Sequence, residues 1–138
     1  MRLIKLLIAM LFCATASSVA EAELVVKVSG PKTTGSKVLI KLELKNTFTE
    51  KIESARAVVF LLDEQGKMVG QSTKWVIGGT KERSTLEPDK KTTFNFVIPA
   101  EKISSTNLIA KVSFNRVVLE GGKLADVHKD VHIEKAEK

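Results

Sequence analysis

Apolar and polar residues alternate along most of the chain after residue 22, with the period of two that is typical of β-strands. The alternation is clearest in residues 37–46, where the apolar side chains fall on one face and the charged ones on the other. Seven segments carry a strand pattern, separated by turn signals at roughly every 8–12 residues. They are residues 24–29, 37–46, 56–63, 68–77, 92–98, 107–120 and 123–134. This spacing predicts an all-β, immunoglobulin-like antiparallel β-sandwich of about seven strands.

Two of the predicted turns are tight hairpins. Gly66 can supply the positive φ that closes residues 63–67, and residues 121–122 are a Gly-Gly pair suited to a two-residue turn. We therefore expect residues 123–134 to pair back against residues 107–120. The apolar positions of residues 123–134 also fit one face of a helix, so a helix remains the alternative for that segment.

Four other segments between or within these strands carry distinct signals. A Gly-Pro pair at residues 30–31 predicts the end of the first strand, residues 46–54 a polar loop, and residues 100–106 one helical turn. Residues 56–63 are apolar on both faces. That pattern is typical of a central strand that is covered on both sides.

Residues 1–22 have the parts of a secretory signal peptide. Arg2 and Lys5 supply a short positive region, and residues 6–16 form an apolar stretch that is too short to span a bilayer. Ser18 with Ala20, and Ala20 with Ala22, place small residues at the positions that a signal peptidase requires, so cleavage is expected after Ala20 or after Ala22. The sequence therefore predicts a cleaved signal followed by one domain, residues 23–138, that is periplasmic or secreted.

The chain's single cysteine, Cys13, lies inside this N-terminal segment. Lipid attachment at Cys13 is the alternative, although Phe12 stands where a bacterial lipobox has a small residue. Cleavage after Ala22 would leave 116 residues with a net charge of +5, and cleavage after Ala20 a net charge of +4. A domain of this size can bury a sufficient core without a disulfide. The modest charge predicts no nucleic-acid partner, and no later run predicts an integral membrane segment.

Several strand ends and turns in the middle of the chain form one pattern. They are Leu44–Thr47, Ile52, Val59–Asp63, Gly66–Gly70, and Leu86–Asp89 followed by Thr93-Phe94. With these motifs, residues 37–98 resemble the FxLYD-type immunoglobulin-like domains of secreted bacterial proteins. The sequence departs from that family at Val59, Leu62 and Asp89, where the family has Phe, Tyr and Gly. The resemblance implies an envelope domain used for adhesion, spacing or binding, and it carries over no catalytic residue.

Metal-capable side chains gather near the C-terminus. If residues 123–134 form one strand, five such side chains point the same way: Asp126, His128, Asp130, His132 and Glu134. Residues four apart on a strand are about 13 Å apart, so His128 and His132 cannot share one ion. Asp126, His128 and Asp130 are the candidate ligands of a weak divalent-metal site that a neighbouring strand would complete. The main interpretation is the solvated face of an edge strand.

Trp75 is the second candidate for a site. We expect it to pack in the core with most of the phenylalanines. The alternative is a ligand-binding patch beside the loop of residues 78–85, in which Trp75 is joined by Lys81 and Arg83, with Lys74 next to them.

No catalytic motif occurs after residue 22: Gly-x-Ser-x-Gly, His-Glu-x-x-His and a cysteine nucleophile are all missing. We therefore expect a non-enzymatic envelope module without a cofactor, which contacts another protein or a surface polymer. Exposed strand edges and the loop of residues 78–85 are the predicted contact surfaces. The alternative is a weak divalent-metal or small-ligand binding protein that uses residues 126–134.

Overall fold

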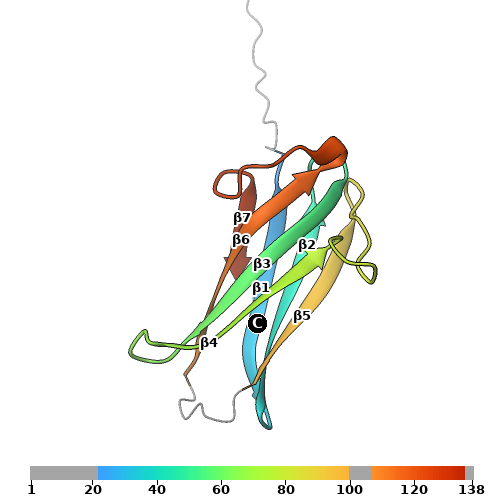
Figure 1. Cartoon of the computed structure of the whole chain (residues 1–138). Coiled ribbons are helices and arrows are strands. Elements are labelled where there is room, and N and C mark those ends of the chain that lie inside the picture. The colour runs from blue at the N-terminus through green and yellow to red at the C-terminus, as the bar shows by residue number, and fades with distance from the viewer. Residues whose placement is uncertain (1–21, 100–106, 136–138) are drawn as a thin grey trace, which may run out of the picture.

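The computed structural model describes residues 22–99 and 107–135, which form two β-sheets packed face to face (Figure 1). The strands are β1 (Leu24–Thr34), β2 (Lys37–Asn46), β3 (Ile52–Leu62), β4 (Met68–Ile77), β5 (Lys91–Pro99), β6 (Ile109–Leu119) and β7 (Val131–Lys135), and a short 3-10 turn, η2 (Glu120–Gly122), follows β6. One sheet has the order β5-β2-β1-β7 and the other β4-β3-β6. The all-β sandwich of seven strands is thus confirmed for the described ranges.

Three predictions fall on residues that the structure does not describe. The signal peptide and the lipid-attachment alternative at Cys13 lie in residues 1–21, and only Ala22 of the predicted signal is described. The helical turn predicted for residues 100–106 lies in the second undescribed segment.

The core forms where the inward faces of the two sheets meet. Strand β2 shows the principle, because its even-numbered residues are buried from Val38 to Asn46 while its odd-numbered ones line the outer face. The largest fully buried side chains are those of Phe96, Leu24, Ile40, Leu42, Leu44, Ile52, Leu61, Ile77, Val26, Val38, Val59 and Val117. The period-two pattern of the sequence therefore predicts most of the core.

Two strands begin or end several residues beyond their predicted bounds. Strand β1 continues past its Gly-Pro pair to Thr34, because a register shift between Ser29 and Lys32 lets its pairing with β2 resume. Strand β3 begins at Ile52, which pairs with Leu119 and bridges to the segment before β5. The predicted strand end at residues 30–31 and the predicted loop end at residue 54 are therefore wrong.

The hairpin between β3 and β4 forms as predicted. One carboxylate oxygen of Asp63 accepts hydrogen bonds from the backbone N–H groups of Gln65 and Lys67, each at 2.9 Å. Gly66 has a φ of 81°, which side chains with a Cβ rarely adopt. An aspartate that bonds the backbone two residues on, followed by glycine, is a characteristic turn chemistry.

The C-terminal strand departs most from the prediction. Gly121 and Gly122 have φ angles of 80° and 83° and form the predicted turn. After the turn, an isolated bridge between Val118 and Leu124 joins the returning chain to β6. The chain then turns at residues 126–130 and crosses to the other sheet, where β7 pairs in parallel with β1. The predicted long strand paired against β6 is therefore wrong, and the four-stranded sheet is mixed.

Asn46, at the end of β2, is the one buried polar residue among the described residues. Its side-chain Nδ2 donates hydrogen bonds to the carbonyl oxygens of Glu50 (3.0 Å) and Leu86 (2.9 Å), and its Oδ1 accepts one from the N–H of Phe48 (2.8 Å). Its backbone carbonyl accepts a hydrogen bond from the N–H of Asp89 at 2.7 Å. The side chain thus ties the loop before β3 to the turn before β5, with its polar atoms satisfied.

Candidate functional site

Residues 126–130 form a compact turn held by two aspartates. The Oδ1 of Asp126 accepts hydrogen bonds from the N–H groups of His128 (2.8 Å) and Lys129 (3.1 Å). The Oδ2 of Asp130 accepts one from the N–H of Asp126 at 2.9 Å. Aspartates that bond nearby backbone in this way favour turns over strands. The ladder predicted along residues 126–134 is therefore interrupted, and only its last two members lie on β7.

This turn changes the setting of the candidate metal ligands. Asp126, His128 and Asp130 share one turn, in which both carboxylates accept backbone hydrogen bonds. On β7, the Nε2 of His132 lies 3.3 Å from the Oε2 of Glu134. Within residues 22–99 and 107–135, no three His, Cys, Asp or Glu side chains gather closely enough to hold a metal ion. A weak metal site at Asp126, His128 and Asp130 stays a prediction.

The turn should respond to acid. Hydrogen bonds from the backbone of His128 and then of Lys129 hold the pKa of Asp126 below its ordinary value of 3.8. Because the folded pKa is lower than the unfolded one, this turn's contribution to stability is present above about pH 4 and is lost as the pH falls through the lowered pKa. A carbon-13 NMR titration should place the midpoint of the Asp126 carboxyl below 3.8.

The matched variant for this titration is Asp126→Asn, which keeps an oxygen acceptor but cannot ionise. In this variant, the acid-induced shifts of the His128 and Lys129 amide signals should vanish. A midpoint at or above 3.8 in the unmodified chain would contradict the hydrogen bonding of the turn.

Trp75 lies half-buried on the outer face of the three-stranded sheet, so its predicted place in the core is wrong. A register shift in the pairing of β3 with β4 adds one residue, so that Val76 and Ile77 are both buried and Trp75 points outward. The guanidinium carbon of Arg56 lies 5.1 Å from the centre of the Trp75 ring. A Cβ on Gly79 would lie 2.3 Å from that ring, so the glycine backbone packs closely against it.

The other two members of the predicted ligand patch lie on the loop after β4. The guanidinium carbon of Arg83 lies 4.6 Å from the centre of the Phe94 ring on β5, and Lys81 is exposed. Arg83 therefore closes the side of the sandwich where β4 and β5 meet, while Trp75 stacks with Arg56 on an outer face. Trp75 and Arg83 therefore contact different partners, and the role of Trp75, Lys81 and Arg83 as a ligand patch stays a prediction.

A small depression of about 210 Å³ lies beside this loop. Glu82, Arg83 and Lys91 contribute its charged lining. The mixture of both signs of charge favours no particular ligand.

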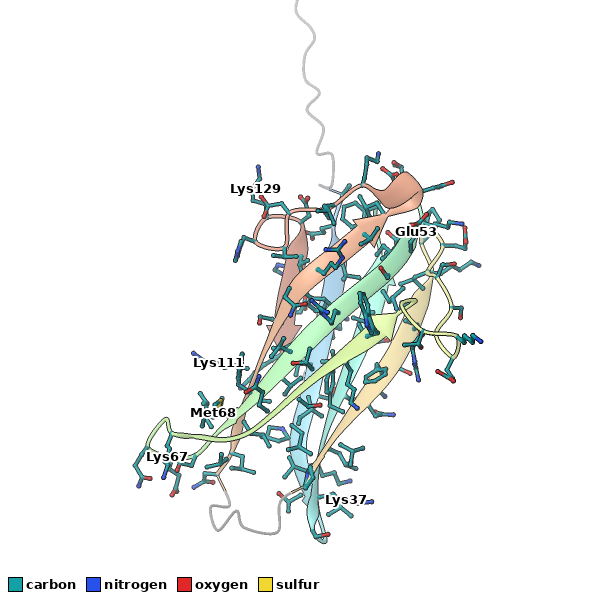
Figure 2. All side chains as sticks on the ribbon, viewed as in Figure 1. Lys37, Glu53, Lys67, Met68, Lys111 and Lys129 are labelled. Carbon is teal, nitrogen blue, oxygen red and sulfur yellow. The ribbon has the colours of Figure 1, made fainter. Side chains whose placement is uncertain are left out.

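The outer face of the three-stranded sheet carries an apolar surface. Val59 and Leu61 of β3 are fully buried, so the alternate residues Val58, Phe60 and Leu62 point outward. Leu62 pairs with Met68 on β4 and with Ile109 on β6, which places the three in one cross-strand row. Met68 is 52% exposed and Ile109 50% exposed. We call Phe60, Leu62, Met68 and Ile109 the apolar outer face, whereas Val58 on the same side of β3 is only 8% exposed. Figure 2 labels Met68, at the start of β4.

Along β6 and the start of β3 the charged side chains that flank the apolar outer face are basic, whereas Glu64 lies at its hairpin end, where its Oε2 accepts a hydrogen bond from Asn107 at 2.7 Å. Lys111 pairs with Phe60, and Arg116 pairs with Arg56, four residues earlier on β3. The Nε of Arg56 donates a hydrogen bond to the Oδ1 of Asn115 at 2.9 Å. In the described part of the chain, no third layer covers this sheet. The sequence did hold a signal for this surface, because residues 56–63 are apolar on both faces.

The sequence matches no family model and no curated protein. Among solved structures, it is similar to the structural-genomics target SoR45, with 14% identity over 76% of this chain and 77% of that chain and a TM-score of 0.50. Others are the ApaA protein of Bordetella pertussis (11% identity, 76% and 83% covered, TM-score 0.49) and IrmA of Escherichia coli (10% identity, 86% and 94% covered, TM-score 0.45). At these identities, the likeness to SoR45 shows the fold alone.

No helix in the two described ranges is long and apolar enough to cross a bilayer.

Proposed function

We propose that this chain is an exported, non-enzymatic β-sandwich module that binds another protein through its apolar outer face. The observation that carries the proposal is the cross-strand row of Met68, Leu62 and Ile109, in which Met68 and Ile109 are each about half exposed. A contiguous apolar surface with a polar border is typical of a protein interaction site. Burial of apolar surface is favourable by roughly 25 cal/mol per Å², from which the entropic cost of association is subtracted.

The border of the face indicates the chemistry of the partner. Arg56, Lys111 and Arg116 flank the apolar side chains, and Glu64 is the acidic neighbour at the hairpin end, where it is hydrogen-bonded to Asn107. The neutral outward positions nearby are Gln71, Thr73, Ser113 and Asn115. A second copy of this chain would place these cations opposite like charges, which opposes self-association. The surface fits a partner that presents aliphatic or aromatic side chains bordered by Asp and Glu.

Export and family membership belong to the same proposal. Export is supported by the charged, apolar and small-residue pattern of residues 1–22. Membership of the FxLYD-type domains is supported by a contact between two of the segments that carry the resemblance. The end of β2 and the turn before β5 meet where Asn46 hydrogen-bonds to Leu86 and Asp89. Asp89 has a φ of 64°, the conformation that glycine adopts readily at the family's usual position.

Photo-crosslinking in the producing cell tests the proposed surface. A photoreactive phenylalanine analogue at Ile109 should give one discrete adduct that is heavier than this chain by the mass of a partner. The matched position is Val97 on β5, which is 48% exposed on the other sheet and should give no such adduct. Lys111→Glu should lower the adduct yield at position 109 by about tenfold, because it places like charge against an acidic partner.

Two results would contradict the proposal. Equal labelling at positions 109 and 97 would mean that the apolar outer face has no preferred partner. An adduct with twice the mass of this chain would show that the crosslinked partner is a second copy of the chain.

A further inference from the structure

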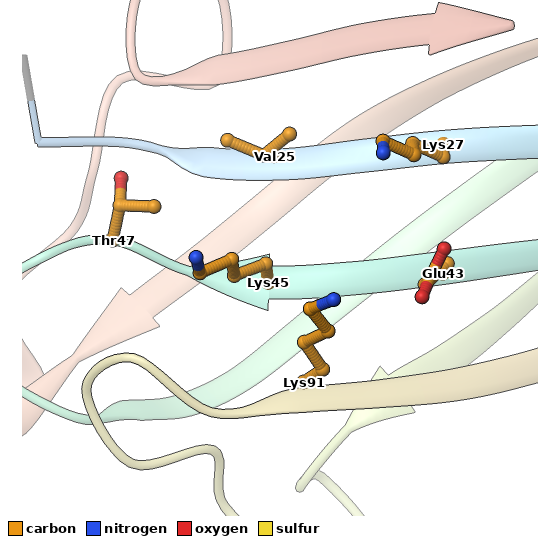
Figure 3. A pocket seen from close by; sticks show the side chains of 6 residues that line it. All are labelled: Val25, Lys27, Glu43, Lys45, Thr47 and Lys91. Carbon is orange, nitrogen blue, oxygen red and sulfur yellow. The ribbon is translucent and has the colours of Figure 1, made fainter. Parts of the chain in front are cut away.

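A shallow depression of about 290 Å³ lies on the outer face of the four-stranded sheet, opposite the surface discussed above (Figure 3). Lys27 of β1, Lys45 of β2 and Lys91 of β5 bring three ammonium groups to it from adjacent strands. Val25, Glu43 and Thr47 complete its lining. Its lining among the described residues includes no arginine.

The register places two of these lysines directly opposite each other. Lys45 and Lys91 are cross-strand partners in the pairing of β2 with β5. Like charges at such positions destabilise a sheet. Within the described residues, neither lysine has a carboxylate within 4.0 Å of its ammonium nitrogen, since the ion pairs found there join Lys123 to Glu50 and His132 to Glu134.

Glu43 supplies the one carboxylate among the described residues that line the depression. It pairs across the sheet with Lys27, on the strand away from β5, and with Thr93 of β5 on the other side. The single carboxylate of Glu43 therefore leaves a net charge of +2 among the three ammonium groups that line the depression. An anion placed between them would relieve their mutual repulsion.

We infer that this depression, which we call the lysine site, binds a phosphate group of a ligand between Lys45 and Lys91, with Lys27 as a third positive charge. Lysine ammoniums act as point charges toward phosphate, while planar carboxylates are matched best by the fork of an arginine. A tetrahedral, multiply charged oxyanion can accept hydrogen bonds from several ammonium groups at once. The inference is independent of the proposed partner surface, which lies on the other sheet.

A titration with pyrophosphate at constant ionic strength tests the lysine site. In nitrogen-15 NMR spectra, we expect saturable shifts of the amide signals at residues 25–27, 43–47 and 91–93. The double variant Lys45→Gln/Lys91→Gln should weaken binding by about tenfold or more, because each charge-assisted hydrogen bond is worth a factor of that order. The matched variant Lys67→Gln/Lys74→Gln removes the same charge near the other sheet and should bind pyrophosphate as the unmodified chain does.

A second arm identifies the source of the phosphate. Vesicles of phosphatidylcholine with phosphatidylglycerol should sediment the chain only if the phosphate belongs to a lipid, and the Lys45→Gln/Lys91→Gln variant should then stay in solution. Binding of pyrophosphate without vesicle binding would assign the site to a soluble phosphate compound. Shifts that do not saturate, or that are equal in both double variants, would overturn the inference, because they would show only screening of the net charge.

Discussion

Replacing Asn46 by alanine should lower the free energy of unfolding by about 3–4 kcal/mol. The variant removes three side-chain hydrogen bonds, to Glu50, Leu86 and Phe48. The N–H of Phe48 and the carbonyl of Glu50 would then lose these partners, and a buried polar group without a partner costs roughly 1–3 kcal/mol. Since small domains are stable by only about 5–15 kcal/mol, this loss would be readily measured by urea unfolding.

Two further variants separate this role from a general effect of substitution. Asn46→Asp keeps an acceptor for Phe48 but cannot donate to the two carbonyls. It should therefore also lose most of the free energy that the Asn46 side chain contributes. Asn95→Ala changes an exposed asparagine on β5 and should alter the free energy of unfolding by less than about 0.5 kcal/mol. A cost below about 1 kcal/mol for Asn46→Ala would show that the loop and the turn are held by other contacts.

Phe96→Ala should cost about 3–5 kcal/mol, because truncation of a buried aromatic side chain leaves a cavity. Phe96 is 1% exposed in the core, and its ring meets that of Phe94 edge to face with 5.1 Å between centres. Loss of this aromatic pair adds to the loss of burial. Urea unfolding followed by circular dichroism measures the change.

The neighbouring residue provides the control for this second prediction. Val97 lies next along β5, on the opposite face, and is 48% exposed. Val97→Ala should change the free energy of unfolding by less than about 0.5 kcal/mol. Similar losses for Phe96→Ala and Val97→Ala would contradict the alternation that places one face of β5 in the core.

The alternation of the sequence predicts the strands and most of the core, since a strand presents alternate residues to one face. It fails for Trp75, because two register shifts between β3 and β4, one on each side of Trp75, each add a residue that no local pattern announces. It fails again after Leu124, where the turn made by Asp126 and Asp130 sends the chain to the other sheet. Both failures come from local backbone irregularities, which shift or redirect every side chain that follows.

The candidate sites could likewise be predicted only in part from the sequence. Residues 56–63 predict cover on both faces of their strand, whereas the structure covers only the inward face within the described residues. The apolar pattern was therefore visible in the sequence, but its use as a surface required the sheet order. The lysine site could not be predicted, because Lys27, Lys45 and Lys91 meet only through the pairing of three strands.

Recovery of a partner by variants of a tagged full-length chain tests the central claim most directly. Ile109→Lys charges the apolar outer face, and Val97→Lys makes the same change on the other sheet at a side chain of similar exposure. Both variants should keep the free energy of unfolding of the unmodified chain to within about 0.5 kcal/mol. We predict that the crosslinked partner identified at position 109 co-purifies with Val97→Lys as it does with the unmodified chain, and is lost with Ile109→Lys. Equal recovery of that partner by both variants would contradict the assignment of binding to the apolar outer face.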